Sequence, residues 1–487
     1  MNAESASNLK TQAANSAFWS LIEKIGIQGL AAVVGLFMTR LLLPADYGLV
    51  AMLDIFIAVG LLISDCGLGQ AYIHKQETES SDASSIFLFN AAAGIILYVF
   101  IFLISKIISD FYSQPQLLAV CRVLSLNIPI QAMGLVHQSK LMKEFRLQIL
   151  TKIKITSLII SGTLGIFLSL KGWGVWALVY YITSFSTLNT LSLWIFAGIN
   201  VRTKLRLSTI RSYFNYSSKI LYASLLDSLY TNFFTMLISK VYQVVTGGLY
   251  SKARLLQNIP VISATQIIQS VSFPLLSKIQ HDAPRFIQAF KKQVRVLSFL
   301  MSFIMGIMIL TAKPFIILVL TDKWLPMLPY FQLLCALGWI LPFHSLHSAL
   351  LNSKGRSDLS LRLEVIKKAI AISGLIISIP FGVEIIIMAQ IAAAVLGLIL
   401  HMIYSKRLTG YTISEQMKDL LPPVLASASI VGAILAFNIF TFSNIILFLT
   451  DIALASALYY LAGYFMKFNE FMFIKNILFN TPSQSNN

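Results

Sequence analysis

The chain has 487 residues, of which 57% are hydrophobic and 12% are charged, and it carries a formal net charge of +17. Its mean hydropathy of +0.77 excludes an ordinary soluble globular protein. The apolar runs are too long for the strands of an outer-membrane β-barrel, so membrane-spanning helices are the remaining solution.

Fourteen hydrophobic segments follow one another along the chain. Each has about 20 residues or more, enough for a helix to cross ~30 Å of hydrocarbon. The sequence therefore predicts an all-α polytopic membrane protein with fourteen transmembrane helices. In chain order the expected spans are 15–39, 47–72, 83–105, 116–138, 149–170, 174–198, 212–239, 248–276, 292–312, 326–351, 361–379, 384–405, 420–440 and 443–466.

Lysine and arginine are distributed unevenly between the loops on the two sides of these spans. Of the 37 such residues, 27 fall on the side of the N-terminus, 6 fall on the opposite side and 4 lie within spans. Because cytoplasmic loops carry an excess of these cations, both termini are expected in the cytoplasm. The cations are dispersed over many short loops beside membrane lipids, so a nucleic-acid partner is not expected.

The chain contains an internal repeat with an offset of 200 residues. Arg40 corresponds to Lys240 near the end of a span, and Gly48-Leu49 corresponds to Gly248-Leu249 at the start of the next span. Six spans separate the two copies, so both copies enter the membrane from the same side. They are therefore parallel repeats.

This repeat predicts the domain organisation. We expect a first lobe of six helices in residues 1–200 and a second lobe of six helices in residues 201–410, related by a pseudo-two-fold axis along the membrane normal. Residues 411–487 add two helices and a cytoplasmic tail. A weaker match, between Pro129 and Pro342 at an offset of 213, agrees with this division. Two such lobes are typical of transporters that open alternately on the two sides of the membrane.

Polar residues are arranged along one face of several spans. In the first span Lys24 and Gln28 lie one helical turn apart, and the repeat places Ser224 and Ser228 at the equivalent positions of the seventh span. The eighth span has a similar polar face that includes Arg254. These faces predict a hydrated cavity between the lobes, although polar residues can also hold helices together.

Charged side chains within the spans are the candidate functional residues, because an unpaired charge at membrane depth is costly. Lysine offers a point charge and arginine a bidentate fork, and both suit the oxygens of a phosphate. The predicted substrate-binding residues are Lys24, Gln28, Arg122, Lys252, Arg254 and Asn258. The candidates for binding a coupling cation are Asp54, Asp65 and Asp227.

The sequence has no Walker A motif, nucleotide-binding glycine loop or hydrolase elbow. His344 and His347 lie three residues apart and could share a metal ion. No Asp, Glu or Cys lies near them in the sequence, so polar packing is favoured. We therefore expect a protein that is not an enzyme and that binds neither a metal nor a cofactor.

Several motifs resemble those of one known family. The turn after the first span reads Leu41-Leu42-Leu43-Pro44-Ala45-Asp46-Tyr47-Gly48-Leu49, and the second span ends in Gly67-Leu68-Gly69-Gln70-Ala71-Tyr72-Ile73. The second repeat adds Gly248-Leu249-Tyr250-Ser251-Lys252-Ala253, followed by Phe273-Pro274 and later by Lys323-Trp324. In this order and spacing, the motifs are similar to those of the Wzx-type polysaccharide-unit flippases of the multidrug/oligosaccharidyl-lipid/polysaccharide exporter superfamily.

The resemblance implies a flippase of the bacterial inner membrane. Such a protein moves undecaprenyl-diphosphate-linked oligosaccharide units from the cytoplasmic to the periplasmic leaflet by alternating access, for the assembly of O-antigen, capsule or exopolysaccharide. The resemblance makes Lys24 and Arg254 the nearest equivalents of basic residues that face the cavity in related flippases. It also makes a polysaccharide polymerase and a chain-length regulator candidate partners.

Two other functions stay open at this point. One is a cation-coupled multidrug antiporter of the same superfamily, although such antiporters usually have twelve spans. The other is a membrane repeat-unit polymerase or glycosyltransferase. Those enzymes usually need a larger extramembrane loop than residues 313–325, which form the longest loop on the predicted periplasmic side.

Overall fold

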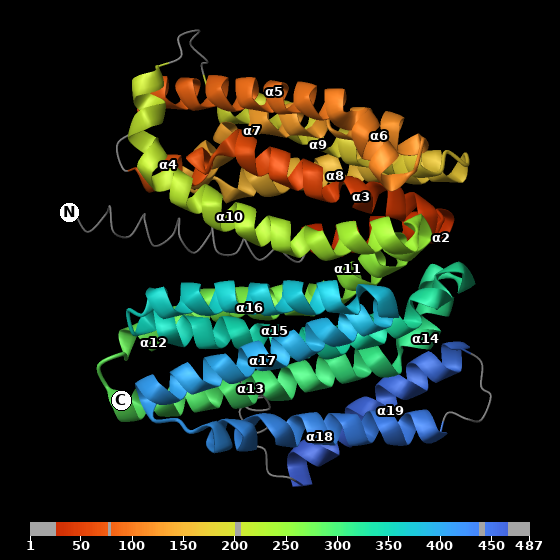
Figure 1. Cartoon of the computed structure of the whole chain (residues 1–487), viewed down its shortest axis with the longest axis vertical. Helices are drawn as coiled ribbons and strands as arrows, with labels where there is room; N and C mark the ends of the chain where they lie inside the picture. The colour runs from red at the N-terminus through yellow and green to blue at the C-terminus, as the bar shows by residue number, and fades with distance from the viewer. Residues whose placement is uncertain (1–25, 76–78, 200–205, 438–443, 466–487) are drawn as a thin grey trace. The chain divides into compact units, whose positions relative to one another are not determined.

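The computed structural model describes residues 26–75, 79–199, 206–437 and 444–465, and these residues form helices joined by short turns (Figure 1). Ten helical segments within this part of the chain are long and apolar enough to cross a membrane. The prediction of an all-helical polytopic membrane protein is therefore confirmed.

The first of two compact units comprises residues 1–251. Within it α8 packs along α2 and α9, α7 packs along α5 and α9, and α10 packs along α3. The described helices of this unit are α2 (Gln28–Leu41), α3 (Pro44–Asp65), α4 (Leu68–His74), α5 (Ser80–Tyr112), α6 (Gln116–Leu124), α7 (Asn127–Lys143), α8 (Leu147–Leu170), α9 (Val175–Ala197), α10 (Leu207–Tyr242) and the first turns of α11 (Val244–Ile267).

The second compact unit comprises residues 252–487. After the rest of α11 it contains the π-helix η2 (Ile268–Ser272), α12 (Phe273–Lys278), α13 (Ala283–Leu310), α14 (Ala312–Phe315), η3 (Ile316–Leu320), η4 (Asp322–Met327), α15 (Leu328–Ser353), α16 (Ser357–Ser378), η5 (Ile379–Phe381), α17 (Val383–Thr409), α18 (Ile413–Phe437) and α19 (Asn444–Phe465). α17 packs along α15 and α16, and α13 packs along α15 and α18. The two helices expected outside the repeat, α18 and α19, both belong to this unit.

Ten of the fourteen predicted spans coincide with the apolar helical segments. Three others coincide with α9, α10 and α16, long helices that are not among these ten segments. The first predicted span, 15–39, lies partly outside the described residues, and α2 is its described part. The total of fourteen and the six-helix lobes stay predictions. α10, which the repeat assigns to the second lobe, belongs to the first compact unit.

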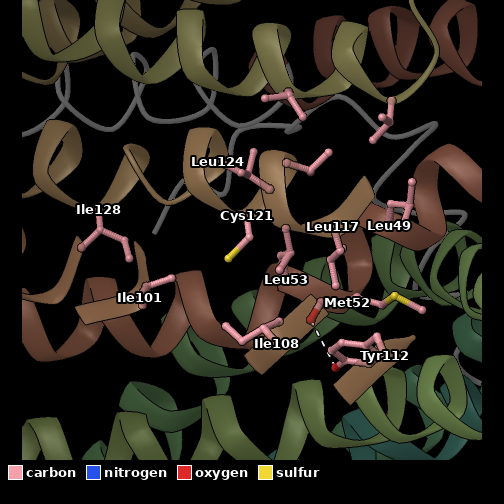
Figure 2. Packing of buried hydrophobic residues seen from close by; sticks show 13 residues of the cluster. Leu49, Met52, Leu53, Ile101, Ile108, Tyr112, Leu117, Cys121, Leu124 and Ile128 are labelled. Carbon is pink, nitrogen blue, oxygen red and sulfur yellow. Dashed lines mark hydrogen bonds between the residues drawn. The ribbon is translucent and has the colours of Figure 1, made fainter. Parts of the chain in front are cut away.

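The first unit has a continuous apolar core between α3, α5, α6 and α9 (Figure 2). In lipid the hydrophobic effect does not drive helices together, so close packing and buried hydrogen bonds must hold them. One such bond joins α5 to α3, where the Tyr112 hydroxyl donates to the Met52 carbonyl at 3.3 Å. The buried side chains of this core include Leu49, Leu53, Ile101, Ile108, Leu117, Cys121, Leu124 and Ile128.

The motif that follows the first span forms the beginning of α3. Pro44 occupies the first turn, where its missing N–H is not needed, and the Asp46 carboxylate accepts a hydrogen bond from the Leu43 N–H at 2.9 Å. Gly48 lies one turn further on, where a β-carbon would overlap the carbonyl oxygen of Val244. The glycine is therefore required for the close approach of α3 to the start of α11.

The contact between α3 and α11 is symmetric under the 200-residue repeat. Gly48 faces Val244, and Gly248 faces the carbonyl oxygen of Pro44 in the same close manner. A shift of 200 residues converts one of these close approaches into the other, because α3 begins at Pro44 and α11 begins at Val244. The same close approach of a glycine to the start of the other helix therefore occurs twice in this contact. We call it the glycine crossing.

The turn between α7 and α8 has the same structure as the turn between α15 and α16. Phe145 and Gly355 both adopt the left-handed conformation, with φ of 54° and 73°. In each turn the N–H of the following arginine donates to the carbonyl five residues earlier at 2.9 Å. The two turns are 210 residues apart. The sequence offset of 213 that pairs Pro129 with Pro342 differs from this separation by three residues, and the equivalence of the two prolines stays a prediction.

Polar contacts join several helix ends at the lysine-rich end of the first unit, which we call its basic end. Asp82, at the beginning of α5, is buried and accepts from Lys75 Nζ at 3.0 Å and from the Tyr213 hydroxyl at 3.0 Å. Lys143 Nζ donates to the Lys75 carbonyl at 2.5 Å. The carboxylate thereby ties together the ends of α4, α5 and α10, and Lys143 adds the end of α7.

Ion pairs attach α18 to α13 at the basic end of the second unit. Lys291 Nζ lies 2.9 Å from the Glu415 carboxylate, and Arg295 Nε lies 2.8 Å from that of Asp419. The Tyr411 hydroxyl donates to the second Asp419 oxygen at 2.5 Å. Each helix supplies two residues one turn apart, so the pairs form a short ladder between the helices.

Candidate functional site

α11 carries three of the predicted substrate-binding residues. Lys252 is buried, whereas Arg254 and Asn258 are half-buried. Arg254 and Asn258 are one turn apart and share a face of α11, and Lys252 points in a different direction because two residues rotate a helix by about 200°. α11 contains Pro260 and continues into the π-helix η2. Such irregular turns within helices often occur at functional sites.

The other predicted substrate-binding residues belong to the first repeat. Lys24 lies outside the described residues. Gln28 is the first residue of α2 and is exposed. Arg122 on α6 is half-buried and is held by α5, because its Nε donates to Ser105 Oγ at 3.0 Å and its guanidinium lies 4.4 Å from the centroid of the Phe102 ring.

The three aspartates considered for a coupling cation have different surroundings. Asp54 is exposed in the middle of α3, and Asp227 is exposed on α10, which packs along α3. Asp65 is half-buried at the end of α3 and accepts a hydrogen bond from the Gly69 N–H at 3.2 Å. Their role in cation binding stays a prediction.

A polar pocket of about 390 Å³ lies within the second unit, between η2, α12, α15 and α16. Its volume falls in the range of roughly 300–1,000 Å³ that is usual for small-molecule sites. Phe273 contributes an aromatic ring to the wall. The polar residues of the wall are Gln269, Ser345, Ser348, Asn352, Ser360 and Glu364.

Behind the pocket, Lys367 connects Glu364 to a histidine on α15. Lys367 Nζ lies 2.6 Å from the Glu364 carboxylate and 3.2 Å from Nδ1 of His344. Because an ammonium group can only donate, Nδ1 of His344 accepts, and its Nε2–H donates to the carbonyl of Ala394 at 3.0 Å. These bonds connect α15, α16 and α17.

A second histidine connects the other side of the pocket to the same helices. His401 donates from Nδ1 to the Gly397 carbonyl at 3.2 Å, so its Nε2 accepts from the Ser348 hydroxyl at 3.3 Å. The ring of His401 is stacked on that of His344, with centroids 5.3 Å apart. The chain of contacts therefore begins at Glu364 and ends at Ser348, two residues of the pocket wall.

The pocket lies close to a turn that is rich in charge. Arg356, between α15 and α16, makes two 3.0 Å hydrogen bonds to the Asp358 carboxylate. These bonds lower the pKa of the Asp358 carboxyl below its usual value. Asp358 lies only two residues before Ser360 of the pocket wall, so the pocket is near the basic end of the unit.

His344 is recognisable as a candidate from the sequence alone, whereas the pocket is not. His344 and His347 have no acidic neighbour in the sequence, because Glu364 comes from the next helix along the chain. Glu364 and Lys367 form a pair with (i, i+3) spacing in a predicted membrane-spanning helix. This charged pair within a span, together with the two histidines, could have indicated the pocket from the sequence alone. In the described part of the chain, no group of three His, Cys, Asp or Glu residues could hold a metal ion.

Comparison with known proteins places the chain among proteins of polysaccharide biosynthesis. The model of a family described as "Polysaccharide biosynthesis protein" matches residues 37–329. The lipopolysaccharide biosynthesis protein WzxC of Escherichia coli (strain K12) is 25% identical over 375 residues, which is 76% of each chain. The succinoglycan biosynthesis transport protein ExoT of Rhizobium meliloti (strain 1021) is 24% identical over 322 residues, 65% of this chain and 64% of the relative.

The fold is shared with solved transporter structures. The lipid II flippase MurJ, in an inward closed conformation, matches with a TM-score of 0.69 and 15% identity over 93% of this chain and 99% of its own. An inward-facing multidrug resistance MATE family transporter matches with a TM-score of 0.61 and 14% identity over 81% of this chain and 99% of its own. At these identities the likeness concerns the fold alone.

Together, the helical fold and the family match define a multi-pass membrane transport protein of polysaccharide biosynthesis. The chain belongs to the polysaccharide biosynthesis protein family. It is similar in sequence to WzxC, and it shares its fold with a solved lipid II flippase and a solved multidrug resistance transporter. The resemblance found in the sequence motifs is thereby confirmed.

Proposed function

We propose that this protein is a flippase for undecaprenyl-diphosphate-linked oligosaccharide repeat units. It moves these units from the cytoplasmic to the periplasmic leaflet of the bacterial inner membrane, where they are assembled into a surface polysaccharide. The observation that carries the proposal is the family match over residues 37–329, since its curated relatives act in lipopolysaccharide, teichuronic acid and succinoglycan biosynthesis.

The fold alone does not choose between a lipid-linked sugar and a drug as the substrate. Both a lipid II flippase and a multidrug transporter share it. The family match favours the polysaccharide unit over the multidrug antiporter, and membership of a transporter family disfavours the polymerase or glycosyltransferase.

The cation distribution supports fourteen spans with both termini in the cytoplasm, arranged as two six-helix lobes and two additional helices. The loops of the proposed cytoplasmic side carry 27 of the 37 lysines and arginines. That asymmetry matches the usual excess of cations in cytoplasmic loops. Polymerase and chain-length regulator are the proposed protein partners on the periplasmic side.

Within the proposed substrate site, Lys24 and Arg254 bind the diphosphate. Gln28, Arg122, Lys252 and Asn258 are proposed as further contacts. The support is chemical, because a diphosphate is a strong acceptor that cationic side chains recognise through charge-assisted hydrogen bonds. Asp54, Asp65 and Asp227 are the proposed candidates for binding a coupling cation.

Deletion of the gene in its own host tests the function. We expect the surface polysaccharide to disappear, and undecaprenyl-linked units to accumulate where a membrane-impermeant lectin added to spheroplasts does not reach them. Surface polymer is measured by immunoblot, and lipid-linked units are measured by extraction and mass spectrometry. Plasmid-borne wild-type protein should restore both to the parental level.

The control separates a failure of transport from a failure of synthesis. A strain that lacks the first glycosyltransferase of the polymer should contain no lipid-linked units at all. If the deletion strain resembles this control, or if it keeps its surface polymer, the protein is not the flippase of that polymer.

A further inference from the structure

The pocket between η2, α12, α15 and α16 has the chemistry of a site for a polyhydroxylated ligand. Two carboxamides, Gln269 and Asn352, can each donate and accept hydrogen bonds. The carboxylate of Glu364 and three serine hydroxyls add acceptors and donors. Phe273 supplies a flat apolar surface on the same wall.

The charges of the wall do not suit a phosphate. Glu364 is the only charged residue among those that line the pocket, all of which are described, and it is an anion. Lys367, the cation bonded to Glu364, does not itself line the pocket and also donates to His344. A diphosphate in the pocket would therefore meet a like charge.

The polar wall is held in a fixed orientation. Lys367 anchors one oxygen of Glu364. The Ser348 hydroxyl donates its hydrogen to His401, so the Ser348 oxygen is left to act as an acceptor. His344 and His401 have defined tautomers, because in each ring one nitrogen donates to a carbonyl and the other accepts from a donor group. Such supporting hydrogen bonds preorganise a binding site.

We propose that this pocket binds a sugar ring of the lipid-linked oligosaccharide, separately from the site of the diphosphate. The inference rests on the proposed function. Free hydroxyls of the sugar donate to Glu364 and Ser348, the carboxamides bind further ring substituents, and Phe273 packs against the apolar face of the ring. The pocket lies near the basic end of its unit, which is the proposed cytoplasmic side where the substrate is loaded.

Ligand-observed NMR on the full-length protein in nanodiscs tests the site. Saturation transfer is measured to a panel of free glucose, galactose, N-acetylglucosamine and glucuronic acid. We expect transfer to at least one sugar of the panel. It should weaken about tenfold or more in Glu364→Gln, which removes a charged acceptor, and in Ser360→Phe, which fills the pocket. Inorganic pyrophosphate should not displace the sugar.

Glu384→Gln is the matched control, because Glu384 is an exposed carboxylate at the beginning of α17 and does not line the pocket. It should bind the sugar like the wild type. The proposal is overturned if no sugar of the panel receives saturation, if neither pocket variant weakens it, or if pyrophosphate competes. If Ser360→Phe does not fold, Glu364→Gln still decides.

The outcomes for the pocket and for the flippase are separable. Loss of surface polymer on deletion, combined with the absence of sugar binding, overturns the sugar site and leaves the flippase standing. Unchanged polymer, combined with sugar binding that depends on Glu364, overturns the flippase and leaves the sugar site standing.

Discussion

Arg122 and Arg254 carry the same charge in different surroundings. The guanidinium of Arg122 is fixed to α5, with its Nε 3.0 Å from Ser105 Oγ and its planar group 4.4 Å from the Phe102 centroid. These contacts stabilise the Arg122 cation within its span even when no substrate is bound. Arg254 is half-buried on the polar face of α11, one turn from Asn258.

Alanine substitution should therefore separate the two arginines. Arg122→Ala should lower the free energy of unfolding by about 1–2 kcal/mol through the lost hydrogen bond and cation–π contact, and should reduce polymer assembly only in part, because Arg122 is proposed as a secondary contact of the substrate. Arg254→Ala should abolish polymer assembly while the protein inserts and accumulates normally. Thermal unfolding in detergent and polymer immunoblots measure both. The opposite result would make Arg122 the phosphate ligand.

At the scale of helices, Gly397 permits the contact between α17 and α16. A β-carbon at this position would lie 2.8 Å from Cγ and Cδ of Lys367 and 3.3 Å from Cε1 of His344. The aliphatic part of Lys367 crosses α17 here before its ammonium group reaches Glu364. Replacement of this glycine thus acts on the support of the sugar pocket without touching its wall.

Gly397→Ala should destabilise the protein by about 1–3 kcal/mol through overpacking, and should weaken sugar binding by displacing Lys367. Gly374→Ala on α16 is the control, since its β-carbon would meet its nearest neighbour, Ala389, at an ordinary 3.6 Å. This control should be neutral or more stable by about 0.5–1 kcal/mol, because alanine favours a helix. Thermal unfolding and saturation transfer are measured on both. Equal effects of the two substitutions would show that the contact with Lys367 is unimportant.

The helices were more predictable than the pocket for a physical reason. A span is local, so hydropathy placed α8 and α15 within two residues of their bounds. The start of α3 was also readable, since Pro44, Asp46 and Gly48 each serve a local turn or a close approach. The pocket combines residues from η2, α12, α15 and α16, and no period in the sequence reports which helices are neighbours. Lys24 lies outside the described residues, so its role stays a prediction.

For the whole molecule, the repeat has a mechanical consequence at the glycine crossing. Gly48 and Gly248 are equivalent in the repeat, and each faces the beginning of the other helix. The crossing lies at the end of the spans that carries few cations, which is the proposed periplasmic side. Alternating access requires this contact to open before a substrate with a bulky oligosaccharide can leave on that side.

A cross-link at the crossing tests this requirement. Cysteines at Asp46 and Thr246, both two residues after the start of their helices, can be joined by a short, cleavable bifunctional thiol reagent. Each single-cysteine variant treated with the same reagent is the control, because Asp46 also accepts from the Leu43 N–H. The cross-linked protein should bind lipid-linked substrate and release none to the periplasm, and cleavage of the reagent should restore export. Undiminished export with the link intact would contradict alternating access and would favour a groove open to both leaflets.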